Sequence, residues 1–573
     1  MPTDASGSAS PPPPQASPPH PPPAAFDLTS RPWIPVQRLD GTEAELSLTE
    51  VFEQASQVRR LVGDVPTQDF ALLRLLLAVL HDALDGPQDI EDWAQLWNDG
   101  DGDIPADRVR DYLREHRGRL DLLHPSTPFL QVPDLRTAKG EYSALDPIVA
   151  DVPNNARFFT MRAHGAQRLG FAEAARWLLH AHAYDTSGIK SGVVGDPRVK
   201  GGKVYPQGVG WAGNLGGVFV EGDDLRATLL LNLLPRDTDN LRFRPDDRPA
   251  WRHEPATAEA LTGAQAQTRP HGLRDLYTWQ SRRVRLHHDG DAVHGVLLAY
   301  GDPLTPRNKH DREPMTAWRR SPAQEKKLGE EQVYLPRDHD PARSAWRGLG
   351  ALVTGQVRGA EQRREAAKIV RPRVLDWIAR LTVEGALDKD FLIRTRLVGA
   401  VYGTQQSVID EIVDDTVAMP VVLLHEQDSS LGQTAVDAVN DAEEAVMVLG
   451  DLATALAEAA GAETEAPRAT ARDRGFAALD EPFRKWLRDL EPSDDPLYPG
   501  EQRRQWQLTA RLVVSGVADD LLGSATEAAW TGRVVAAKNG SVWLNASRAD
   551  LRFRSGLRKA LPMATPDDPE APQ

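Results

Sequence analysis

The pattern of apolar and polar positions differs before and after Pro341. Before it, helical and strand-like stretches alternate. Ser47-Leu-Thr-Glu50 has the spacing of a capping box, and the stretch from Thr67 to Leu84 is apolar on every side. Val218 to Leu234 is typical of two strands joined by a turn. We therefore expect a mixed region of helices and strands, with the apolar helix buried nearly all round.

After Pro341, apolar residues recur with a period near 3.6, which predicts helices. The expected helices cover Arg343–Gly359, Glu361–Arg380, Lys389–Tyr402, Gln405–Ala418, Pro420–Glu463, Arg472–Leu490, Glu501–Gly523 and Arg548–Leu561. The last four provide enough length for an antiparallel four-helix bundle. The predicted fold class is α+β, with a large mixed α/β N-terminal domain over residues 26–415 and a C-terminal helical bundle over residues 416–565.

The two ends of the chain are expected to lie outside these domains. Residues 1–25 hold ten prolines, a composition that cannot build a core, and residues 566–573 form a second tail. The first Lys or Arg is Arg31, so we expect no signal peptide with a charged start at the N-terminus. The longest apolar run, Ala71 to Leu80, is far shorter than the ~20 residues that span a bilayer. We expect no membrane association.

The charged residues and the lack of cysteine narrow the chemistry further. With no cysteine, the chain has no disulfide, thiolate zinc site, iron–sulfur cluster or cysteine nucleophile, and a cytoplasmic location is expected. The net charge of −16 argues against a general coat of DNA-binding charge. Its distribution is uneven: between Arg396 and Arg468 there is no Lys or Arg, whereas Arg468 to Lys559 holds sixteen basic against twelve acidic residues. Solvated helix faces are the alternative explanation.

Ser187 to Gly217 contains ten glycines but matches no catalytic motif. Lys203 is followed by Val204 instead of Ser or Thr, which excludes a P-loop. The stretch Gly188-Ile-Lys-Ser191-Gly192 has one residue too many for a nucleophile elbow. His180 and His182 would point to different sides of a helix, so they are unsuited to one metal ion. We predict a protein that is not an enzyme and has no cofactor or metal site.

The glycine-rich segment suits contact with a nucleic acid better. Glycines let a phosphodiester approach the main chain, and four basic residues are placed to neutralise phosphates: Lys190, Arg198, Lys200 and Lys203. The run Arg157-Phe158-Phe159-Thr-Met-Arg162 sets aromatic rings beside guanidinium groups, as single-strand binders do. A surface loop is the alternative for the glycines, and core packing is the alternative for the two phenylalanines.

Four further segments carry a family resemblance. They are Trp33-Ile-Pro-Val36, His124-Pro-Ser-Thr-Pro-Phe-Leu-Gln131, Phe219 to Leu234, and Tyr402-Gly-Thr-Gln-Gln-Ser407. In this order they resemble the CasA family, the large subunit of the type I-E CRISPR surveillance complex Cascade, from about Phe26 to Leu561. The resemblance implies recognition of the protospacer-adjacent motif in double-stranded DNA, help with duplex unwinding and R-loop formation, and docking of a helicase–nuclease. It implies guide RNA (crRNA), target DNA and other Cascade subunits as partners.

The resemblance also implies roles for particular residues. The loop that lies in the minor groove at the motif would contain Gly188, Lys190, Ser191 and Gly192. The wedge that splits the first base pair would be Gln405 or Gln406, beside Thr404. The loop that meets the 5′ handle of the guide RNA would contain Arg157, Phe158, Phe159 and Arg162. The family's lysine finger falls near His294, so Arg307 or Lys309 is expected to substitute for it.

Contacts to the DNA backbone are expected from a set of basic residues: Lys200, Lys203, Arg307, Lys309, Arg503, Arg504, Arg552 and Arg554. The alternative function is an RNA- or single-strand-binding scaffold subunit of another ribonucleoprotein. That function would use the same basic and aromatic segments, so the residues alone do not separate the two.

Overall fold

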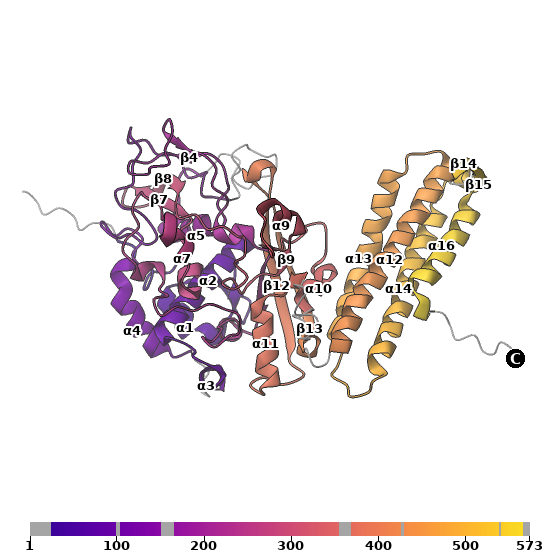
Figure 1. Cartoon of the computed structure of the whole chain (residues 1–573), viewed down its shortest axis with the longest axis horizontal. Coiled ribbons are helices and arrows are strands. Elements are labelled where there is room, and N and C mark those ends of the chain that lie inside the picture. The colour runs from indigo at the N-terminus through magenta and orange to yellow at the C-terminus, as the bar shows by residue number, and fades with distance from the viewer. Residues whose placement is uncertain are drawn as a thin grey trace, which may run out of the picture.

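The computed structural model describes residues 25–98, 104–150, 166–353, 368–425, 429–537 and 540–564. Figure 1 shows a mixed part of helices and small sheets, drawn in indigo to salmon, joined to a group of long helices drawn in orange to yellow. Across these ranges, no helix combines the length and the apolar character needed to cross a membrane. The predicted α+β fold class is confirmed.

The chain enters through a small antiparallel sheet. Strand β1 (Ile34–Arg38) lies between β2 (Glu43–Leu46) and β3 (Val58–Leu61). The predicted capping box starts α1 (Leu48–Glu53): the Ser47 hydroxyl accepts from the Glu50 amide, and the Glu50 carboxylate accepts from the Ser47 amide at 2.8 Å.

Helix α2 (Pro66–Leu84) is the centre of the mixed part. Almost every residue in it is buried, as its apolar sequence predicts. It packs against α5 (Phe171–Tyr184) and α8 (Leu273–Tyr277). The other helices of this part are α3 (Ile90–Asn98), α4 (Ala106–His116), α6 (Leu225–Leu231), α7 (Gly263–Thr268), α9 (Pro322–Leu328), α10 (Gly350–Val353) and α11 (Arg373–Val383).

Other short strands of the mixed part also pair in antiparallel fashion. They are β4 (Lys190–Ser191) with β5 (Lys203–Val204), β7 (Arg282–His288) with β8 (Val293–Tyr300), and β9 (Trp318–Arg320) between β10 (Tyr334–Pro336) and β11 (Ile369–Val370). Strand β4 lies against β8, so the β4–β5 and β7–β8 hairpins form one corner of the molecule (Figure 1).

The longest strands form a hairpin where the sequence pattern predicts helices. Strand β12 (Leu392–Tyr402) pairs with β13 (Ile409–Pro420) along its whole length, and its other edge pairs with β6 (Gly217–Glu221). The helices predicted over Lys389–Tyr402 and Gln405–Ala418 are therefore wrong. Residues 395–399 are all buried, as expected for a central strand that is paired on both edges.

The second strand predicted between Val218 and Leu234 is also wrong. After β6 the chain turns into helix α6, and the Asp224 side chain caps it by accepting from the Ala227 amide at 2.7 Å. The acidic turn read from the sequence is therefore a helix start, because an aspartate at this position satisfies a free amide of the first helical turn.

The four predicted helices of the C-terminal part are present. They are α12 (Ser429–Ala460), α13 (Glu465–Arg488), α14 (Tyr498–Gly523) and α16 (Ala546–Ala560), and the other three pack against α12. Helix α15 (Glu527–Thr531) and the hairpin of β14 (Arg533–Ala537) with β15 (Gly540–Leu544) precede α16. The predicted domain boundary between residues 415 and 416 falls inside β13, and the bundle begins at Ser429.

Polar contacts join the middle of β13 to the bundle. Arg484 of α13 donates to the Asp415 carboxylate at 2.9 Å and to the Thr416 carbonyl at 2.6 Å. The Trp346 indole donates to Asp480 at 2.8 Å and stacks on Phe483, with ring centroids 4.3 Å apart. The two parts therefore meet through a packed and hydrogen-bonded junction.

Candidate nucleic-acid interface

The free end of the β12–β13 hairpin carries the residues predicted as the wedge. Thr404, Gln405 and Gln406 form one tight turn, and all three are exposed. Gln405 and Gln406 have φ values of +58° and +54°, a left-handed conformation that residues other than glycine rarely adopt. The prediction that a helix begins here is wrong. The turn instead holds two long polar side chains at the end of a paired hairpin.

Hydrogen bonds fix this turn to the glycine-rich segment. The Ser187 amide donates to the Gln406 carbonyl at 2.7 Å, and the Ser187 hydroxyl accepts from the Gly208 amide at 3.1 Å. The Tyr402 hydroxyl donates to the Tyr184 carbonyl at 2.7 Å. Two segments predicted separately from the sequence therefore form one surface. The sequence did not indicate Ser187, because its contact with Gln406 is made by the backbone amide and does not depend on the type of residue.

Gly188 and Gly192, predicted together as the minor-groove loop, have different surroundings. The Gly188 carbonyl accepts from the Tyr300 hydroxyl at 2.7 Å, and a Cβ at Gly188 would meet no atom within 4 Å. The Gly192 amide donates to the Gly202 carbonyl at 2.9 Å, and a Cβ there would lie 2.6 Å from Val199 and 2.7 Å from the Gly202 backbone. Gly192 is therefore required to close the β4–β5 hairpin, whereas Gly188 borders open space.

A buried ion cluster supports the loop from below. The Asp185 carboxylate accepts from Lys190 Nζ at 2.8 Å and from the Arg282 guanidinium. Arg282 also donates to the carbonyls of Thr186 and Gly208 at 3.1 and 3.0 Å. Burial raises the pKa of Asp185, but Lys190 and Arg282 outweigh it and hold that pKa below its usual value. Because the Lys190 side chain is only 10% exposed, it anchors the loop and is not free to contact a phosphate.

The other basic residues predicted near this surface differ in accessibility. Lys200 and Lys203 are exposed, and their backbones pair with each other across the loop. Arg307 forms an ion pair with Glu330 at 3.3 Å. Lys309 is half-buried, and burial lowers its pKa. Arg198 is held by Asp196 at 2.9 Å. Lys200 and Lys203 are thus the accessible cations of this loop.

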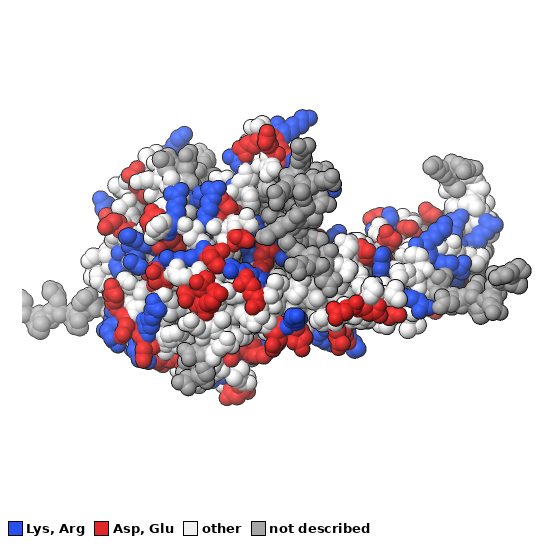
Figure 2. Space-filling view, turned by 60° about the horizontal axis from the view of Figure 1, so that its bottom comes forward, with Lys and Arg blue, Asp and Glu red and all other residues white. Residues whose placement is uncertain are grey.

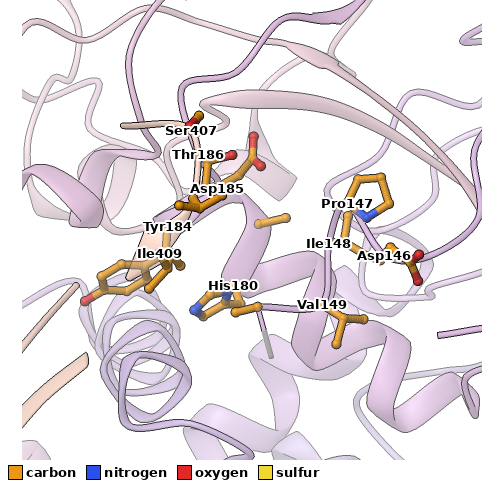
Figure 3. Close-up of a pocket in the computed structure, with 13 residues that line it drawn as sticks. Asp146, Pro147, Ile148, Val149, His180, Tyr184, Asp185, Thr186, Ser407 and Ile409 are labelled. Atoms are coloured by element: carbon orange, nitrogen blue, oxygen red, sulfur yellow. The ribbon is translucent and has the colours of Figure 1, made fainter. Parts of the chain in front are cut away.

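A pocket opens beside the turn, as Figure 3 shows. It is lined by residues 146–150, by the end of α5 with His180 and Tyr184, and by Ser407 to Ile409 at the start of β13. The His180 ring stacks on Tyr184 and shares a 2.9 Å hydrogen bond with the Thr67 hydroxyl. Burial lowers the pKa of His180 to about 3, so the ring is neutral at pH 7.

This shift predicts a dependence of stability on pH. The folded protein holds His180 neutral down to about pH 3, whereas the unfolded chain protonates it below pH 6.5. The free energy of unfolding therefore does not suffer from His180 above pH 6.5. It falls as the pH drops from there toward 3, because the unfolded chain then binds a proton that the folded chain does not. We expect His180→Gln to reduce the loss of unfolding free energy between pH 7 and pH 5 by about 2 kcal/mol. Urea unfolding at both pH values measures this, and an unchanged difference would contradict it.

The predicted guide-RNA contacts Arg157, Phe158, Phe159 and Arg162 lie outside the described residues. His294, at the position of the family's lysine finger, is half-buried beside Tyr142, with ring centroids 5.9 Å apart. Within the described ranges, no group of three or more potential metal-ligating residues is arranged around one point.

The basic residues predicted on the bundle are not equivalent. Arg503 is held by Asp437 and Asp441 at 2.9 and 2.8 Å, so it contributes to packing between helices. Arg554 pairs with Asp550 at 2.9 Å. Arg504 and Arg552 are exposed. Sequence reasoning missed three other exposed basic residues of α16: Arg548, Arg558 and Lys559. In Figure 2, Lys and Arg side chains gather at the right of the view, the side on which Figure 1 labels α16.

Comparisons with known proteins agree with the fold. The sequence matches the family described as CRISPR-associated protein Cse1 over residues 27–517. The crystal structure of Thermobifida fusca Cse1 is 65% identical and covers 95% of this chain and 99% of that chain, with a TM-score of 0.88. A CasA/Cse1 protein of Thermus thermophilus is 33% identical over 337 residues, which are 58% of this chain and 61% of that relative, less than two thirds of its length.

A more distant structure shows the same fold. A chain of a CRISPR RNA-guided surveillance complex is 19% identical, covers 87% of this chain and 99% of that chain, and has a TM-score of 0.65. The family match extends over both the mixed part and most of the bundle. From this match and from the shared architecture, the chain belongs to the Cse1 (CasA) family of CRISPR-associated proteins.

Proposed function

We propose that this chain is the large subunit of a type I-E Cascade complex. In that role it recognises the protospacer-adjacent motif in double-stranded DNA, starts duplex unwinding and docks the helicase–nuclease. Its partners are then the guide RNA, the target DNA and the other Cascade subunits. Family membership supports the assembly, and the paired loops of the candidate interface support the contact with DNA.

One observation carries the proposal: the 2.7 Å hydrogen bond from the Ser187 amide to the Gln406 carbonyl. It places the open backbone at Gly188 beside the exposed side chains of Gln405 and Gln406. A duplex whose minor groove lies on Gly188 would present its next base pair to these glutamines. Recognition and strand separation would then happen at adjacent points of one surface.

The physical chemistry fits these roles. The minor groove offers few distinguishing base edges, so a backbone loop can accept several related motifs. Inserting a side chain between base pairs costs a few kcal/mol of stacking, and pairing with the guide RNA offsets that cost. Neither step breaks a covalent bond. The proposed role is therefore binding and mechanical opening without catalysis by this chain.

Copurification tests the proposal. A tagged chain, expressed with its native CRISPR operon, is isolated and its bound RNA is sequenced. Spacer-containing guide RNA and stoichiometric companion subunits are expected. An RNA population without repeat-derived 5′ ends would overturn the assignment and favour a scaffold subunit of another ribonucleoprotein.

The exposed arginines of α16 give a prediction about salt dependence. Reversing the charge of Arg552 and Arg558 is expected to weaken DNA binding most at low salt. The slope of log affinity against log salt should fall by about one for each phosphate that the variant no longer neutralises. Binding isotherms between about 50 and 300 mM salt measure the slope. Arg503→Gln serves as the control, because its ion pairs with Asp437 and Asp441 predict lower stability with an unchanged slope.

A further inference from the structure

A pair of stacked rings on the β7–β8 hairpin, one of them exposed, has no part in the roles above. Tyr142 lies on His287 with ring centroids 4.0 Å apart and ring planes 13° from parallel. Tyr142 is 48% exposed. Burial and the nearby Arg285 lower the pKa of His287 to about 4, so the lower ring is neutral at pH 7. An exposed aromatic ring that is already packed on one side is an arrangement on which a base can stack.

The backbone around Tyr142 holds its ring in one position. His287 and Gly295 face each other across the β7–β8 hairpin. A Cβ at Gly295 would lie 2.4 and 2.5 Å from two atoms of the Tyr142 ring, so only glycine leaves room for it. The next residue, Ser143, exchanges two 2.9 Å hydrogen bonds with the backbone of Val296. One face of the tyrosine ring therefore rests on the sheet, and the residue remains half open to solvent.

Exposed basic residues precede the ring in the chain. Arg136 and Lys139 are exposed on the segment that leads to Tyr142, together with the acids Asp134 and Glu141. Arg285 lies two residues before His287 on β7 and so on the same face of the strand. The surface is also continuous with the glycine-rich segment, because the Val194 amide donates to the Arg136 carbonyl at 2.9 Å.

We propose that Tyr142 is a stacking platform for one unpaired nucleobase of a single strand, whose flanking phosphates meet Arg136 and Lys139. A base has two flat faces and an anionic backbone, which match a fixed ring beside two cations. This site goes beyond the proposed function, since it needs an unpaired base and neither a motif nor a duplex. The strand could be displaced DNA or guide RNA, and the experiment separates them.

Binding by the full-length chain tests the platform. Twelve-nucleotide single strands with one central 2-aminopurine, made as DNA and as RNA, report stacking by fluorescence quenching. We expect Tyr142→Ala to weaken binding about tenfold and to abolish the quenching, because stacking on one aromatic ring has roughly that value. Tyr142→Phe should restore both. Trp530→Ala removes a residue with the same 48% exposure at the far end of the molecule and should change neither.

A second measurement needs no substitution and so does not depend on the variant folding. A strand carrying 5-iodouracil is cross-linked to the unmodified chain by light, and the product is mapped by mass spectrometry. Cross-linking at Tyr142 supports the platform, and the strand that gives the higher yield identifies its source. Products only at other residues, or full affinity of Tyr142→Ala, would overturn it. A chain that cross-links at Tyr142 but opens no motif-bearing duplex would refute only the proposed function.

Discussion

Replacing Gln405 and Gln406 together is expected to slow the opening of target DNA while leaving the first encounter with the motif nearly intact. Both side chains are exposed at the hairpin tip, and the contact with Ser187 uses the backbone carbonyl of Gln406, which a change of side chain does not remove. Unstacking one base step costs a few kcal/mol, and a wedge would offset part of that cost. Removing the wedge should therefore lower the rate of R-loop formation by about tenfold or more. Permanganate reactivity of unpaired thymines beside the motif measures the opening.

The choice of replacement matters because both residues have positive φ. Alanine in that conformation costs on the order of 1 kcal/mol per residue, whereas glycine adopts it freely. The double variant that combines Gln405→Gly with Gln406→Gly removes the side chains and keeps the turn. Equal slowing in the alanine and glycine variants would assign the effect to the side chains. A pre-opened bubble should rescue both, and normal opening of linear duplex by either would contradict the wedge.

Substitutions of the two glycines of the loop, Gly192 and Gly188, are expected to have different effects. Gly192→Ala should loosen the β4–β5 hairpin, since its Cβ would overlap the Gly202 backbone, and overpacking of this kind costs about 1–3 kcal/mol. Hydrogen exchange of the Gly192, Lys200 and Lys203 amides, which bond across the hairpin, should then speed up by about tenfold or more.

Gly188→Val should leave those amides as protected as before, because nothing lies within 4 Å of the new Cβ. Its effect should appear on DNA: binding to a motif-bearing duplex is expected to weaken, while binding to a pre-melted target without the motif stays close to normal. Equal losses on both targets would show that the loop does not read the groove.

The parts of the fold that were predicted correctly rest on interactions within a few residues. The capping box joins Ser47 to Glu50, three residues later, and the burial of α2 follows from the apolar residues of the helix itself. The helix predicted over Lys389–Tyr402 is wrong because β12 is a central strand with residues 395–399 all buried, so its sequence lacks the alternation of a strand with one exposed face. The buried Arg396 of β12 forms ion pairs with Asp69 of α2 at 3.0 Å and with Asp414 of β13 at 2.7 Å, so its partners come from other elements.

The candidate site was predicted in pieces for the same reason. The sequence indicates Gln405 and Gly188 individually. The hydrogen bond that joins their loops runs from the Ser187 amide to the Gln406 carbonyl, and backbone groups of this kind are present in almost every residue. Lys190 was assigned to a phosphate because its charge is visible in the sequence and its buried partner is not. Asp185 lies five residues earlier, yet Arg282, which completes the cluster, comes from a different hairpin.

The β12–β13 hairpin is exposed at its tip and held in its middle. Gln405 and Gln406 stand exposed at the tip, whereas Arg484 of the bundle binds Asp415 and Thr416, which pair with the middle of β12. A strand of twelve residues extends about 40 Å, and a fully paired hairpin bends far less easily than a loop. The pairing with β6 and the contact with Arg484 meet the hairpin at the same level, so the part beyond them projects from one support. A substitution of Arg484 should therefore loosen that support and shift the tip without altering Gln405 or Gln406.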